Sequence, residues 1–78
     1  MIHVSVVGAT GYTGGELLKI LKNHPDVRVT HVTTSSAPGK PLAEAHPFLR
    51  GVYDLVLESY DAKKLAEDTD VAFFLSFA

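Results

Sequence analysis

The sequence contains no cysteine and no long hydrophobic run. Without cysteine the chain can form no disulfide framework, and it offers no thiol nucleophile for covalent catalysis. No apolar stretch approaches the roughly 18 residues that span a bilayer. The N-terminal residues Met1-Ile2-His3 also lack the basic segment that opens a signal peptide. We therefore expect a cytoplasmic protein that has no membrane partner.

An excess of charge of either sign is also lacking. The 78 residues carry a formal net charge of -2, with 46% hydrophobic and 21% charged residues, which is ordinary globular composition. This near-neutral balance gives no electrostatic basis for binding nucleic acid. The chain is also short for a complete doubly wound α/β domain, which usually needs two βαβαβ halves.

The stretch Val4–Glu16, which reads VSVVGATGYTGGE, is the most informative part of the chain. An apolar run leads into Gly8, Gly11 and Gly14 at threefold spacing, and a stripe of leucines begins directly behind them. This order predicts strand, glycine turn and helix, the entry to a dinucleotide-binding βαβ unit. Glycine permits a sharp turn and close approach of a ligand, and the start of a helix favours a pyrophosphate. The alternative is a tight turn in a sheet that binds no nucleotide.

Hydrophobic periodicity and turn residues divide the whole chain into alternating strands and helices. We expect Thr13 to cap the first helix and Glu16 to lie in its first turn, where the helix dipole favours an acid. The last strand should pair with the far side of the first strand. The pattern predicts an α/β fold, namely the first part of a Rossmann-like, doubly wound parallel sheet. The expected elements are buried strand Ile2–Val7, helix Tyr12–Lys22, strand Val27–Thr34, short helix Pro41–His46, short strand Leu55–Glu58, helix Ala62–Asp68 capped by Asp61, and buried strand Val71–Ser76.

The end of the second predicted strand indicates which dinucleotide binds. An NAD-binding unit places an acidic residue about 20 residues beyond the glycines, where it holds the ribose 2′-hydroxyl. Here no acidic residue lies between Asp26 and Glu44. The hydroxyls of Ser35 and Ser36, followed by Lys40, suit a 2′-phosphate instead, which favours NADP over NAD. The alternative is that this segment, which contains serine, proline and glycine, is simply a turn.

The residues quoted so far carry a resemblance to a known family. VVGATGYTGGELL, then LKNHPDV, a strand ending in TTSS, and GKPLAEAHPFLRGVYDLVLE together resemble the N-terminus of N-acetyl-γ-glutamyl-phosphate reductases. The resemblance covers essentially the whole chain and depends most on the runs Gly8–Glu16 and Gly39–Gly51. Aspartate-semialdehyde dehydrogenases share the glycine turn but resemble the later stretch less.

The resemblance implies an enzyme of arginine biosynthesis. Such enzymes use NADPH to reduce N-acetyl-γ-glutamyl phosphate, a small acyl phosphate, to N-acetylglutamate semialdehyde with release of phosphate. A cysteine thiolate forms a thioester that accepts hydride, and a histidine assists as acid and base. In the family both residues lie in a later domain. We therefore expect residues 1–78 to be the N-terminal part of an NADP-binding domain, inactive alone and belonging to an enzyme that forms homo-oligomers.

The resemblance also implies roles for particular residues. No residue of this chain is expected to be catalytic or to bind a metal. His31 is expected to be a packed or edge histidine, and His46 in the His-Pro step to anchor a loop. The expected pyrophosphate loop comprises Gly8, Thr10, Gly11, Tyr12, Thr13 and Gly14, and the expected adenosine end comprises Ser35, Ser36 and Lys40.

Other functions remain open from the sequence. The enzyme could act on a related acyl phosphate of the lysine pathway, or be an aspartate-semialdehyde-type dehydrogenase. The chain could instead be a nucleotide-binding module without catalysis. It could also be a structural fragment that associates through an exposed sheet edge, because Val71–Phe77 reads VAFFLSF.

Overall fold

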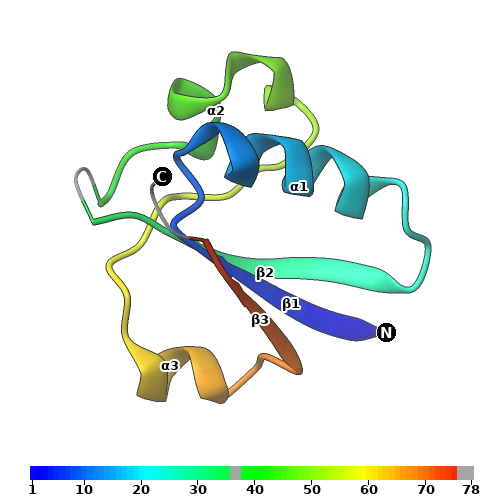
Figure 1. The fold of residues 1–78 in the computed structure, drawn as a ribbon, viewed down its shortest axis with the longest axis vertical. Helices are drawn as coiled ribbons and strands as arrows, with labels where there is room; N and C mark the ends of the chain where they lie inside the picture. Colours follow the sequence, from blue (N-terminus) through cyan, green and yellow to red (C-terminus); the bar gives the residue numbers. More distant parts are fainter. Residues whose placement is uncertain (36–37, 76–78) are drawn as a thin grey trace.

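A parallel three-stranded sheet forms the centre of the computed structural model, which describes residues 1–35 and 38–75. Its strands are β1 (Ile2–Val7), β2 (Val27–Thr33) and β3 (Val71–Phe74), in the spatial order β2-β1-β3 (Figure 1). Both outer strands run parallel to β1. The carboxyl ends of all three strands therefore meet at one edge of the sheet.

Helices cover both faces of this sheet. Helix α1 (Tyr12–Lys22) joins β1 to β2 on one face, where α2 (Leu42–Ala45) and the 3₁₀ helix η1 (Pro47–Leu49) also lie (Figure 1). Helix α3 (Ala62–Ala66) lies on the opposite face and precedes β3. This is the doubly wound arrangement, so the prediction of a Rossmann-like α/β fold is confirmed.

The core lies between the sheet and α1. Its buried side chains come from β1 and β2, from the inner face of α1 and from the segment after β2, which folds back over the same face. Burial of these apolar groups is the main stabilising contribution to such a small domain. The largest fully buried apolar side chains are Leu18, Leu42, Leu49, Val6 and Val32.

The first helix has the predicted bounds, but its capping residue differs from the predicted one. Gly11 is its N-cap residue, with extended backbone angles (φ -73°, ψ 168°) and no side-chain cap hydrogen bond to any described residue. The predictions for Thr13 and Glu16 are therefore wrong, because Thr13 is already inside the helix and the first turn holds no acid. The helix ends as predicted, with Asn23 as its C-cap residue.

The segment predicted as strand Leu55–Glu58 forms only two isolated bridges. Glu58 pairs with Thr33 of β2 and Val56 with Pro41. Helix α2 begins directly after Pro41, so the second bridge stays single. The segment nevertheless lies beside β2, as predicted. Pro41 itself precedes α2 as its N-cap residue, whereas we had expected it to be the first residue of a helix.

The later elements are shorter or more exposed than predicted. Helix α3 ends at Ala66, although Asp61 caps it as expected, accepting the Lys64 N–H at 3.2 Å. Strand β3 ends at Phe74 and is exposed along its length, because it is an edge strand with one neighbour. Ser76, where the strand was expected to end, lies outside the described residues. Within the described part of the chain, no helix is long and apolar enough to cross a membrane.

Candidate functional site

The glycine turn lies where the three strand ends meet. Beyond β1, the Val7 carbonyl accepts the Leu75 N–H at 3.0 Å. On the other side, Thr33 at the end of β2 makes two hydrogen bonds to the turn. Its carbonyl accepts the Ala9 N–H at 2.9 Å, and its Oγ1 accepts the Gly8 N–H at 3.3 Å. In open α/β sheets, ligands bind outside the carboxyl ends of the strands. The turn therefore occupies the expected ligand-binding edge.

Two of the three predicted glycines are required by the protein's own packing. Gly8 has φ +84°, and a Cβ there would lie 2.8 Å from the Leu75 carbonyl oxygen. A Cβ on Gly14 would lie 2.5 Å from the Ala9 carbonyl oxygen. Only glycine fits at either position without a shift of the backbone. Gly8 makes the tight turn, and Gly14 lets α1 pack closely against the turn.

Gly11 has no such packing requirement. Its φ of -73° is accessible to any residue, and no described atom lies within 4 Å of where its Cβ would be. The position opens instead onto free space at the start of α1. The first N–H groups of a helix have no partner within the helix and carry the positive end of its dipole. Space and donors together fit a pyrophosphate.

The other residues predicted for this loop surround the open position. Thr10 is half-buried in the turn, whereas Tyr12 and Thr13 form the first turn of α1 and are exposed, Tyr12 by 84%. Their backbone N–H groups therefore belong to the same helix start as the open space at Gly11. The assignment of these residues to a pyrophosphate site stays a prediction.

The residues predicted for the adenosine end lie just beyond β2. Ser35 is exposed, and Ser36 lies outside the described residues. Lys40 lies at the same end of the sheet. The Leu57 N–H donates to the Lys40 carbonyl at 2.8 Å, and the next residue, Glu58, bonds to β2. The Lys40 ammonium lies 3.4 Å from Glu44, and both side chains are exposed. Such an exposed pair is weak, so the ammonium can turn to another anion.

The structure brings an acidic residue to the end of β2 that sequence reasoning missed. Glu58 bonds through its backbone to the Val32 carbonyl and the Thr34 N–H, at 2.9 and 2.8 Å. Its carboxylate does not remain available for a ribose, however. One oxygen lies 2.6 Å from His31 Nδ1 and the other 2.8 Å from Lys64 Nζ.

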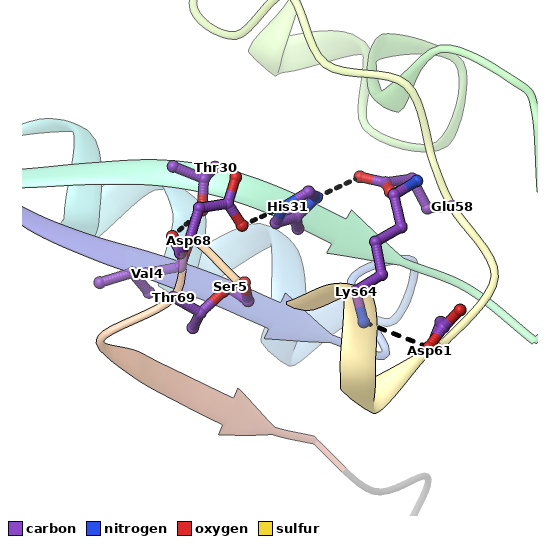
Figure 2. A network of polar contacts seen from close by, with 9 residues as sticks. All are labelled: Val4, Ser5, Thr30, His31, Glu58, Asp61, Lys64, Asp68 and Thr69. Carbon is purple, nitrogen blue, oxygen red and sulfur yellow. Dashed lines mark hydrogen bonds and ion pairs between the residues drawn. The ribbon is translucent and has the colours of Figure 1, made fainter. Parts of the chain in front are cut away.

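His31 is the centre of a polar cluster on the α3 side of the sheet (Figure 2). Its Nδ1 contacts Glu58 and its Nε2 contacts Asp68, both at 2.6 Å. Both ring nitrogens can donate only when the imidazole is protonated. Burial opposes this charge, but the hydrogen bonds and negative charges of Glu58 and Asp68 outweigh it and raise the pKa of His31. The two carboxylates lie at opposite nitrogens, and no group of described residues is arranged to hold a metal ion.

His46 anchors a loop, as predicted. It is buried, and its Nε2 lies 2.7 Å from the carbonyl oxygen of Ala9 in the glycine turn. The partner could not be predicted, because the two residues are 37 positions apart. In the 3₁₀ helix that follows, Leu49 is buried at 1% exposure, whereas Phe48 is 53% exposed.

Comparison with known proteins agrees with this geometry. Residues 3–76 match the family described as semialdehyde dehydrogenase, NAD binding domain. The chain is 48% identical over 73 residues to an N-acetyl-γ-glutamyl-phosphate reductase of Citrifermentans bemidjiense, and 47% identical to a LysW-L-2-aminoadipate/LysW-L-glutamate phosphate reductase of Sulfurisphaera tokodaii. Each match covers 94% of this chain but 21% of the relative. The chain therefore spans about a fifth of the length of these relatives.

A solved structure shares the fold. It is aspartate semialdehyde dehydrogenase with NADP from Candida albicans, which superimposes with a TM-score of 0.85 at 23% identity and covers 99% of this chain and 24% of its own. The family match confirms the expected resemblance and the expected class of cofactor, a nicotinamide dinucleotide. Fold, glycine turn and sequence match agree that the chain belongs to the NAD-binding domain family of the semialdehyde dehydrogenases, which are oxidoreductases.

Proposed function

We propose that this chain is the N-terminal part of the cofactor domain of an NADPH-dependent acyl-phosphate reductase. The observation that carries the proposal is the open position at Gly11. The protein's own packing explains glycine at positions 8 and 14, but nothing described in the chain explains it at position 11. A close approach of ligand to backbone does explain it, and this is the role of the middle glycine in a dinucleotide-binding turn.

The two ends of the cofactor have separate binding residues in this proposal. The start of α1 directs backbone N–H groups and the positive end of its dipole at the pyrophosphate. At the adenosine end, serine hydroxyls and a lysine ammonium bind the 2′-phosphate, since charge-assisted hydrogen bonds are the strong ones. The residues are Gly8, Thr10, Gly11, Tyr12, Thr13 and Gly14 for the first group, and Ser35, Ser36 and Lys40 for the second.

The proposed reaction is reduction of an acyl phosphate to an aldehyde with release of phosphate. NADPH supplies the hydride for this reduction. A thiol nucleophile would have to come from outside residues 1–78, because this chain has no cysteine. The task of these residues is to bind and orient the cofactor, and we expect them to be inactive alone. The cytoplasmic location and the homo-oligomeric state of the complete enzyme stay predictions.

We propose N-acetyl-γ-glutamyl phosphate as the substrate, since a relative named as its reductase shares 49% identity with this chain. The relative named for LysW-linked substrates is almost as similar, at 47%, and makes a carrier-linked acyl phosphate the alternative. Assay of the complete enzyme with both acyl phosphates and with aspartyl phosphate decides between them. Turnover of none of the three would contradict the proposed reaction.

The cofactor site is tested by titrating the complete enzyme with NADPH and with NADH in a calorimeter. We expect tighter binding of NADPH, and loss of binding in Gly11→Val, because the side chain would fill the pyrophosphate space. Lys19→Val is the matched control, since it places the same side chain on the exposed face of α1 about two turns away. Wild-type affinity in Gly11→Val would contradict the pyrophosphate assignment.

A further inference from the structure

The Ala9 carbonyl is held from two sides. Ala9 is fully buried between the first two glycines of the turn. Its carbonyl oxygen lies so close to α1 that a Cβ on Gly14 would be 2.5 Å away. On another side, His46 Nε2 lies 2.7 Å from the same oxygen. A carbonyl only accepts, so Nε2 carries the proton in this hydrogen bond.

His46 itself is rigidly placed between α2 and η1. Its N–H donates to the Leu42 carbonyl at 3.0 Å, and its carbonyl accepts the Leu49 N–H at 2.9 Å. The following residue, Pro47, disfavours the helical region for the backbone of His46, and the observed angles (φ -131°, ψ 85°) lie outside that region. The side chain is buried at 7% exposure. The imidazole is therefore presented to the turn in one fixed orientation.

The second glycine of the Gly14-Gly15 pair provides the space for this imidazole. A Cβ on Gly15 would lie 2.8 Å from His46 Cε1 and 2.9 Å from His46 Nδ1. It would also lie 3.1 Å from the ring of Phe48, which packs edge-on against the imidazole at a centroid distance of 5.6 Å. The two neighbouring glycines thus both leave room around the Ala9 carbonyl. The missing side chain of Gly14 leaves space for the oxygen, and that of Gly15 leaves space for the imidazole that binds it.

We propose that His46 is a positioning residue for cofactor binding, an inference that rests on the proposed function. The peptide between Ala9 and Thr10 is planar, so its C=O and N–H groups point in opposite directions. When His46 holds the Ala9 oxygen toward the protein interior, the Thr10 N–H is directed the other way, toward the open side of the turn. His46 thereby orients a pyrophosphate donor without touching the cofactor.

The test compares variants of the complete enzyme that keep or remove the donor at position 46. His46→Leu keeps a side chain of similar bulk but leaves the Ala9 oxygen without its donor. We expect its Kd and KM for NADPH to rise about tenfold while kcat at saturating NADPH stays within about twofold. His46→Gln keeps an N–H donor and should restore the Kd to within about threefold of wild type. Circular dichroism establishes that each variant is folded.

Leu49→Ala is the matched control for general loosening of the segment. Leu49 is buried in η1, three residues after His46, but its side chain has no donor for the Ala9 oxygen, so its variant should lose thermal stability and keep the wild-type Kd. Unchanged Kd in folded His46→Leu, or an equal rise in Leu49→Ala, would overturn the positioning role and leave the proposed function intact. Failure of the wild-type enzyme to bind NADPH would overturn both.

Should His46→Leu fail to fold, His46→Asn replaces it in the comparison. The side chain of asparagine is one methylene shorter than that of glutamine, so we expect its amide not to reach the Ala9 oxygen. A tenfold weaker Kd in His46→Asn than in His46→Gln supports the proposal. Equal values for the two amides overturn it.

Discussion

At the scale of single residues, the glycines of the turn have different structural roles, which their spacing in the sequence does not distinguish. Gly14 faces the Ala9 backbone at 2.5 Å, whereas Gly11 faces open space. Gly14→Ala should therefore lower the free energy of unfolding by about 2 kcal/mol, as overpacking against backbone does. Gly11→Ala should change it by less than about 0.5 kcal/mol. Urea denaturation of the complete enzyme measures both. Equal tolerance of the two substitutions would mean that the helix does not pack on the turn as described.

Cofactor preference is also decided by single side chains at the end of β2. Lys40→Ala should weaken NADP binding about tenfold and leave NAD binding nearly unchanged, since only NADP carries the phosphate that the ammonium would meet. Ser35→Ala should act in the same direction. Glu44→Ala is the control, because it frees Lys40 from its neighbour at 3.4 Å and should not weaken NADP. Equal weakening of NADP and NAD in Lys40→Ala would make this segment a structural turn only.

At the scale of elements, the His31 cluster joins β2 to the segments on either side of α3. His31 bonds Glu58 before the helix and Asp68 after it, and Thr30 donates to the Asp68 carbonyl at 3.5 Å (Figure 2). Lys64 of α3 completes the cluster by pairing with Glu58. The cluster therefore ties three stretches that are far apart in sequence, and its strength depends on charge.

The charges of the cluster predict a stability optimum between about pH 4.5 and 6.5. The pKa of His31 is raised above 6.5, so its contribution is complete below that pH and is lost as pH rises through the folded-state pKa. For Glu58, burial opposes the charge, but Lys64 and His31 outweigh it and lower the pKa below 4.5. Its contribution is present above pH 4.5 and is lost as pH falls through the folded-state pKa.

Thermal unfolding across this pH range measures the effect, with His31→Gln as the comparison. The variant keeps polar contacts but cannot be protonated. It should therefore lack the stability loss that the wild type shows as the pH rises above 6.5. His24→Gln is the control, because His24 is exposed. Parallel pH profiles for wild type and His31→Gln would contradict the protonated state assigned to His31.

The helices and strands of the first half could be predicted from local pattern, and those of the second half only in part. Helix α1 and strands β1 and β2 have strong periodicity, and their bounds were found to within one residue. The segment before Glu58 was mistaken for a strand. Leu55 and Leu57 pack on the core while Val56 is exposed, as in a strand, but the backbone forms only isolated bridges. Gly15, Glu58 and the partner of His46 were missed because each acts across a long sequence separation. Short-range patterns carry no information on such contacts.

At the scale of the whole molecule, the exposed face of β3 predicts how residues 1–78 behave alone. Val71, Phe73 and Phe74 are all exposed, Phe74 by 64%, and Tyr60 packs edge-on against Phe74 at a centroid distance of 5.8 Å. Among the residues that the structure describes, the strand pairs with β1 alone, and an apolar edge strand is a template for pairing with another chain. We expect the isolated 78-residue chain to self-associate through this edge.

Analytical ultracentrifugation of the isolated chain over a concentration series measures this association. Phe74→Lys should shift the chain toward monomer, because a charge on an edge strand opposes edge-to-edge pairing. Ile20→Lys is the matched control: Ile20 is equally exposed, at 67%, but lies on α1 away from the edge. It should therefore leave the association unchanged. Wild-type chain that sediments as a monomer, or equal dissociation in both variants, would show that β3 is not the associating surface. Association that only Phe74→Lys relieves would locate the associating surface at the β3 edge of the sheet.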